Sequence, residues 1–211
     1  MNKKQLIDAI ADLEWKMFST VNNEGSKAAC QRDITTFRIM RNSQSFCWSV
    51  ELLSAYLMDL TLAEAQGRNL MSEKYVRMME STFPDEYARL ADKLPEVDAL
   101  TARQIEEIVI IHVAWKESLD SRYPHLADRS RPVHTRDDSP GLTSLETYMR
   151  AELKTFSPKT IALYHTATLE RLAQGKNEAE EILLHQVRHY GYESLEQAEV
   201  FSAPGHGAPK S

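Results

Sequence analysis

Residues 101–122, TARQIEEIVIIHVAWKESLDSR, decide the expected fold because they are apolar on nearly every side when drawn as a helix. Thr101 followed by Gln104 matches a capping box, which predicts that the helix begins at position 102. A helix that is apolar nearly all round belongs in a protein interior. We therefore expect residues 102–122 to form the central, most buried helix. His112 within it is expected to be a core histidine rather than a ligand.

The segments around it also carry helical periodicity, and none alternates between apolar and polar residues with a period of two. We predict an all-α fold: a single compact multi-helix domain of about eight to ten helices over residues 1–201, with 202–211 as a flexible C-terminal tail. Capping residues and turn formers bound the expected helices, which cover residues 3–21, 34–48, 49–66, 69–82, 84–90, 102–122, 143–154, 158–173, 177–190 and 194–201.

The overall composition narrows the class of protein. Of 211 residues, 42% are hydrophobic and 27% charged, with a net charge of −6. This is ordinary for a globular protein, and the negative charge argues against a nucleic-acid or anionic-membrane partner. No apolar run is long enough to span a membrane, and two cysteines make no disulfide scaffold. We expect a cytoplasmic protein that binds neither nucleic acid nor membrane, and its oligomeric state and cofactors stay open.

Two charged residues interrupt apolar helix faces. Glu14 lies at helical spacing from Ile7, Ile10 and Phe18, and Arg41 lies in a similar stripe on the next expected helix. Glu14 either reaches water at the edge of its stripe or is buried against an arginine or a ligand. The two residues could satisfy each other, or Arg41 could present its fork to a carboxylate or phosphate.

A third charged cluster lies in residues 67–82, GRNLMSEKYVRMMEST. Glu73 and Arg77 are one turn apart on a helix, the spacing at which opposite charges pair. They form either a surface ion pair or the lining of a pocket.

Other segments offer weaker signals. The irregular stretch 123–142 is either a functional loop, whose Arg and His side chains could meet an anion, or a solvated variable loop. Glu146 follows Thr143 in a second capping-box pattern, which gives it a structural role at the helix start. Cys30 precedes a helix start, where thiolates are stabilised, but it could equally be a small core residue.

A metal site receives little support. His185 and His189 are four residues apart on one expected helix, which is ligand spacing, but no HExxH pattern accompanies them. We predict no metal site from this pair alone.

Five strings resemble the signature blocks of a bacterial family, domain of unknown function 4125 (DUF4125). They cover roughly residues 11–199 and comprise EWKMFSTVNNEG, CQRDITTFRIMRNSQ, GRNLMSEKYVRMMEST, TSLETYMRAELKT and YGYESLEQAE. Ala29 stands where the family blocks usually carry serine. The resemblance implies an all-helical cytoplasmic prokaryotic protein and brings no assigned reaction.

Two functional hypotheses follow. In the first, the chain is an enzyme acting on a small polar, zwitterionic or anionic metabolite, with a pocket among helices 3–21, 34–48 and 69–82. Glu14 or Glu73 acts as acid or base and Cys30 is a possible nucleophile. The expected ligand-binding residues are Asn22, Asn23, Gln31, Arg41, Gln44, Arg68, Arg77 and Glu146. In the second, the chain is a non-enzymatic ligand-binding or interaction module whose charged residues form a buried structural network.

Overall fold

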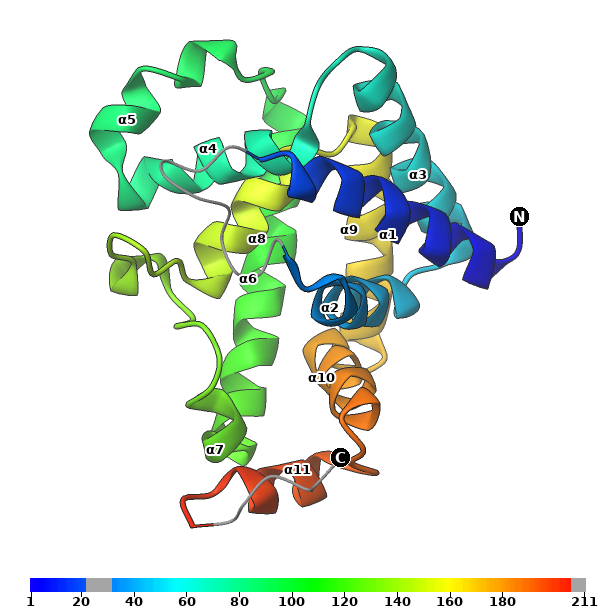
Figure 1. Cartoon of the computed structure of the whole chain (residues 1–211), viewed down its shortest axis with the longest axis vertical. Coiled ribbons are helices and arrows are strands. Elements are labelled where there is room, and N and C mark those ends of the chain that lie inside the picture. The colour runs from blue at the N-terminus through cyan, green and yellow to red at the C-terminus, as the bar shows by residue number, and fades with distance from the viewer. Residues whose placement is uncertain (22–31, 206–211) are drawn as a thin grey trace.

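The computed structural model describes residues 1–21 and 32–205, and within these ranges the chain is helical without a β-strand (Figure 1). This confirms the all-α prediction. The α-helices are α1 (Lys3–Ser19), α2 (Ile34–Phe46), α3 (Val50–Ala65), α4 (Leu70–Thr82), α5 (Pro84–Ala88), α6 (Ala99–Arg122), α7 (Pro124–Ala127), α8 (Leu145–Leu153), α9 (Pro158–Ala173), α10 (Glu178–His189) and α11 (Leu195–Ser202). Two short 3₁₀ turns, η2 (Ala91–Lys93) and η3 (Thr135–Asp137), lie in the connections.

Helices α6 and α9 run side by side along the long axis of the molecule (Figure 1). Helix α3 packs against α1 and α9, and α4 packs against α8, which in turn contacts α6. Helix α10 lies against α2 and α6, and the short helices α7 and α11 meet at the opposite end from α4.

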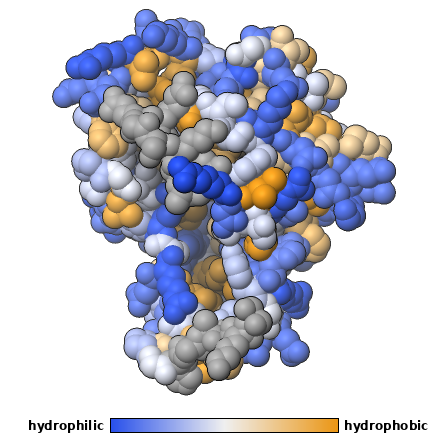
Figure 2. Space-filling model, in the orientation of Figure 1, coloured by the Kyte–Doolittle hydropathy of each residue, from blue (hydrophilic) through white to orange (hydrophobic). Residues whose placement is uncertain are grey.

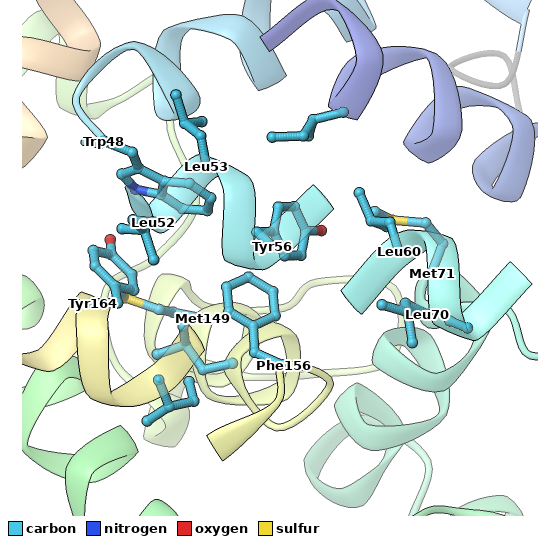
Figure 3. Packing of buried hydrophobic residues seen from close by; sticks show 14 of the residues in the cluster. Trp48, Leu52, Leu53, Tyr56, Leu60, Leu70, Met71, Met149, Phe156 and Tyr164 are labelled. Carbon is cyan, nitrogen blue, oxygen red and sulfur yellow. The ribbon is translucent and has the colours of Figure 1, made fainter. Parts of the chain in front are cut away.

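The main core is built around α3 rather than α6. Leu53 and Leu60 on α3 are fully buried, and the Tyr56 ring lies 4.4 Å from that of Phe156, centroid to centroid (Figure 3). Helix α6 contributes Ile108 to this core but leaves Ile110 66% exposed. Seven of the 24 residues of α6 are buried, against six of the 16 residues of α3, so the prediction that 102–122 is the most buried helix was wrong.

A smaller apolar cluster holds the far end of the molecule together. Leu119 and Tyr123, at the end of α6, pack there with residues of α10 and α11: Val187, Leu195 and Ala198. Because α11 is only eight residues long, its position depends on this packing rather than on its own helical stability.

Two helix starts differ from the predicted capping boxes. The Asp98 carboxylate caps α6 by accepting from the N–H groups of Leu100 and Thr101, so the helix begins three residues early. Ser144 caps α8, and Glu146 makes no bond to that cap. In both places a neighbouring residue that also favours the N-cap position caps the helix instead, and residue spacing alone does not show which of the two candidates does so.

The connection from α3 to α4 fixes where the charged cluster of 67–82 lies. Gly67, at φ +69°, ends α3, and the next N–H, that of Arg68, donates to the Ala63 carbonyl at 2.8 Å. This is the 6→1 bond of a Schellman motif. Asn69 then caps α4 and also donates from its side chain to the Met17 carbonyl of α1. The start of α4 is thus tied to the end of α1.

Within the described residues, no helix combines the length and apolar character needed to cross a membrane. On the face shown in Figure 2, hydrophobic residues are scattered among hydrophilic ones.

Candidate functional site

Glu14 and Arg41 meet in the interior between α1 and α2. Glu14 is fully buried and Arg41 is 6% exposed. Arg41 Nε donates to Glu14 Oε2 at 2.8 Å, and its second terminal nitrogen donates to Oε1. Tyr56 also donates its hydroxyl to Oε1, at 2.7 Å. The prediction that these two charges satisfy each other is confirmed, and the alternative of a solvent-exposed Glu14 is wrong.

A second acid and a second base complete this buried cluster. Glu152 of α8 lies 2.8 Å from the remaining terminal nitrogen of Arg41, and Lys74 of α4 lies 3.6 Å from the same Glu152 oxygen. Lys74 also donates to the Tyr148 hydroxyl at 2.8 Å, and Arg41 donates to Gln44 at 2.9 Å. We call Glu14, Arg41, Lys74 and Glu152, from four different helices, the buried tetrad.

The charges of the buried tetrad cancel, two against two. Burial acts to raise the pKa of the Glu152 carboxyl, but Arg41 and Lys74 outweigh it and hold that pKa below its ordinary value. Burial acts to lower the pKa of Lys74, whereas Tyr148 and Glu152 raise it overall. The surroundings of Lys74 and Glu152 therefore favour their charged forms, which is typical of a structural ion-pair network.

Glu73 and Arg77 do not pair with each other in an ion pair. Glu73 accepts two bonds from Arg68, each at 2.8 Å, because the turn at Gly67 brings Arg68 alongside the first turn of α4. Arg77, which is 9% exposed, donates to the Pro95 carbonyl at 2.6 Å. Its Nε is buried and has no hydrogen-bond partner among the described residues.

Arg77 lines a pocket of about 270 Å³ between α4, α8 and η3, which we call the cationic pocket. Two further cationic side chains line it, Arg150 of α8 and Lys154 at the C-cap of α8, and Glu80 is the acidic residue of the lining. Hydroxyl groups complete the polar lining and come from Ser81, Thr135 and Thr147. This pocket is displaced from the predicted site, since side chains of the buried tetrad fill the space among α1, α2 and α4.

The wall of the cationic pocket is held by a second layer of carboxylates. Glu146 accepts from the Thr135 backbone N–H at 2.9 Å and from Arg150 at 2.9 Å, and Arg150 also pairs with Glu106. Asp138 accepts from the hydroxyls of Ser81 at 2.5 Å and Thr147 at 2.6 Å. Glu146 was predicted to bind ligand or cap a helix, but here it orients an arginine of the pocket.

A separate buried carboxyl lies at the start of α10. Glu178 is 1% exposed, accepts from the Tyr164 hydroxyl at 3.2 Å and lies 3.8 Å from Arg171. Burial raises the pKa of Glu178 to about 7, although Arg171 acts in the opposite direction. Burial, followed by Arg171, lowers the pKa of the neighbouring His112 to about 3, which fits the predicted core role of this histidine.

The remaining histidines and cysteines form no metal site in the part of the chain that the structure describes. His185 and His189 lie with ring centroids 4.9 Å apart, but His185 Nδ1 bonds the Ser43 hydroxyl at 2.8 Å and its ring stacks on Phe46. Burial raises the pKa of the Cys47 thiol to about 12, so this thiol stays protonated.

Four predicted site residues fall in positions 22–31, outside the described residues: Asn22, Asn23, Cys30 and Gln31. Their proposed roles stay predictions.

Sequence reasoning missed several residues that matter in these sites. Lys74 shares a helix face with the buried Leu70, Met71 and Met78, the same kind of signal that singled out Glu14. Glu152 likewise lies one turn from Met149. Arg150 and Lys154 lie in the string TSLETYMRAELKT that resembles a family block, but helical spacing alone does not separate them from ordinary surface charges.

These features define a class: an all-helical protein with a charge-balanced polar cluster in its core and a cationic pocket beside it. The chain belongs to the family described as protein of unknown function (DUF4125), whose model matches residues 4–200. No curated protein and no solved structure matches it.

Proposed function

We propose that the chain binds a small anionic metabolite in the cationic pocket between α4 and α8. The observation that carries the proposal is Arg77. This guanidinium is almost fully buried, has no carboxylate within ion-pair distance among the described residues, and leaves its Nε without a partner. Burial lowers the pKa of Arg77, and the nearby charge of Glu73 offsets this only in part. An uncompensated buried cation is costly, and an anion in the pocket would compensate it.

The other pocket residues support an anion with several oxygens. Arginine presents a planar fork that suits carboxylate and phosphate, while lysine supplies a point charge. Lys154 forms a long ion pair with Glu80, at 3.9 Å, which is beyond hydrogen-bond distance. The volume of about 270 Å³ suits a small molecule rather than a macromolecule.

Acid–base catalysis by Glu14 has weaker support. Both of its carboxylate oxygens already accept hydrogen bonds within the buried tetrad, and the side chain is fully buried. Glu73 is likewise committed to Arg68. Binding is therefore the function that the surroundings of these residues favour.

Calorimetric titration with inorganic phosphate tests the proposal. We expect saturable binding to the unmodified protein, and a Kd at least about tenfold weaker for Lys154→Met, because one charge-assisted bond is lost. Lys176→Met is the matched control, since Lys176 is exposed beyond the end of α9 and lines no described pocket. Absence of binding to phosphate, sulfate and acetate, or equal affinity in Lys154→Met, would overturn the proposal.

A further inference from the structure

A second pocket, of about 190 Å³, adjoins the cationic pocket. Lys154 lines both pockets. Arg77 lines the first and donates to the carbonyl of Pro95, which lines the second. The two hollows are therefore neighbours that these side chains separate, and a ligand that occupied both would lie across Lys154. We call the second hollow the acceptor pocket, for the reason given next.

The acceptor pocket lies where α6 and α9 begin, at the same end of the molecule (Figure 1). Its polar lining is rich in hydrogen-bond acceptors. Asp98 and Glu96 present carboxylates. The Thr101 hydroxyl already donates to Asp98, so its oxygen can only accept a further bond. The Ser157 hydroxyl shares a hydrogen bond with the Thr160 hydroxyl. A ligand group beside Glu96 therefore gains most by bringing hydrogen-bond donors.

The balance of charges in the acceptor pocket indicates whether these donors are charged or neutral groups of the ligand. The ionised groups of the acceptor pocket are Arg68, Lys154, Glu96 and Asp98, two positive and two negative. A second ion would gain no net attraction there, whereas neutral hydroxyl groups can donate to the carboxylates and accept from the cations. Pro95 and Val97 add apolar surface against which C–H groups can pack.

We infer that the ligand is a polyhydroxylated compound bearing one anionic group, such as a sugar phosphate, with its anion in the cationic pocket and its hydroxyls in the acceptor pocket. This inference rests on the proposed function and adds the chemical class of the ligand. Its most specific prediction is that the Glu96 carboxylate accepts a hydrogen bond from a ligand hydroxyl group. The carboxylate is exposed and makes no hydrogen bond or ion pair among the described residues, so it is available to a ligand.

Titration calorimetry with four probes tests the inference: inorganic phosphate, glucose 1-phosphate, glucose 6-phosphate and phosphoethanolamine. We expect at least one of the sugar phosphates to bind at least about tenfold more tightly than inorganic phosphate, since a gain of that size needs only one or two good hydrogen bonds. Glu96→Ala should remove this advantage and leave the affinity for inorganic phosphate unchanged. Glu86→Ala, which removes an exposed carboxylate of α5 outside both pockets, should change neither affinity.

The outcomes separate the two proposals. If inorganic phosphate binds but neither sugar phosphate binds more tightly, or if Glu96→Ala changes nothing, the inference fails and the anion site stands. Tighter binding of phosphoethanolamine than of both sugar phosphates would also overturn it, in favour of an amine. If no phosphate compound binds, the anion site itself fails.

Discussion

The Arg41 guanidinium lies fork to fork against the Glu14 carboxylate, with 2.8 Å between Nε and Oε2, and both side chains are shielded from solvent. Their helices are joined at this contact, and Glu152 and Lys74 extend it to α8 and α4. A buried ion pair adds little net stability by itself, but loss of one partner leaves the other charge unpaired. The buried tetrad should therefore respond strongly to single substitutions.

Arg41→Met should lower the free energy of unfolding by about 3–5 kcal/mol, because it leaves Glu14 and Glu152 with one cation between them. Urea denaturation measures this directly. The matched control on the same helix is Arg38→Met, which breaks the exposed pair with Asp12 and should cost less than about 1 kcal/mol. Equal effects of the two substitutions would show that burial of the Arg41 pair does not matter.

Tyr56→Phe should lower the free energy of unfolding by about 1.5–3 kcal/mol, the usual range for a hydrogen bond to a charged group. The change removes only the hydroxyl that donates to Glu14 and keeps the ring packed on Phe156. Tyr190→Phe, at a half-exposed ring, is the control and should have almost no effect. A Tyr56→Phe protein as stable as the unmodified one would contradict the role given to this bond.

Glu178 should make stability depend on pH. Its pKa is about 7 in the folded protein against an ordinary 4.5, so the native state binds this proton more tightly than the unfolded chain does. The contribution to stability is full below pH 4.5 and is lost as the pH rises to about 7.

Glu178→Gln keeps a neutral polar group at this position. It should match the unmodified protein near pH 4.5 and be more stable at pH 8, by up to about 3 kcal/mol. His112 lies 3.9 Å from Glu178, and burial lowers its pKa to about 3, so it stays neutral in the folded unmodified protein at both pH values. Denaturant titrations at both pH values measure the difference. A Glu178→Gln protein that is less stable at pH 8 would show that the carboxylate form is the favoured one.

Gly67→Ala should cost about 1 kcal/mol or slightly more, because Gly67 has a φ of +69° and an L-residue is strained there. A Cβ atom at this position meets nothing within 4 Å, so the cost is conformational rather than steric. Gly67→Asn should cost less, since asparagine tolerates this conformation better. Thermal unfolding distinguishes the two variants, and equal losses would contradict a purely conformational cost.

Much of the fold was readable from the sequence because most helices begin at a recognisable cap. Ser157-Pro158 correctly placed the start of α9, and the acid in the apolar stripe of α1 correctly pointed to a buried partner. Local spacing failed where several partners competed. Glu73 had Arg77 at the right spacing along the helix, but the turn at Gly67 offered it Arg68 instead.

The cationic pocket was beyond sequence reasoning for a different reason. Part of its lining comes from α4, which is far along the chain from η3 and α8, so no local pattern brings Arg77 together with Thr135 and Arg150. Only the packing of α8 against α4 does so. A helical sequence predicts which residues share a face, but not which two faces meet.

The most direct test of the central claim is the NMR signal of the Arg77 Nε–H group during titration with inorganic phosphate. The signal can be assigned by its absence in Arg77→Lys. Because Arg77 lines the cationic pocket and its Nε has no partner among the described residues, an anion bound beside this guanidinium should shift the signal saturably, with the same Kd as calorimetry gives. A signal that stays in place while phosphate binds, or that never responds because nothing binds, would contradict an anion site at Arg77.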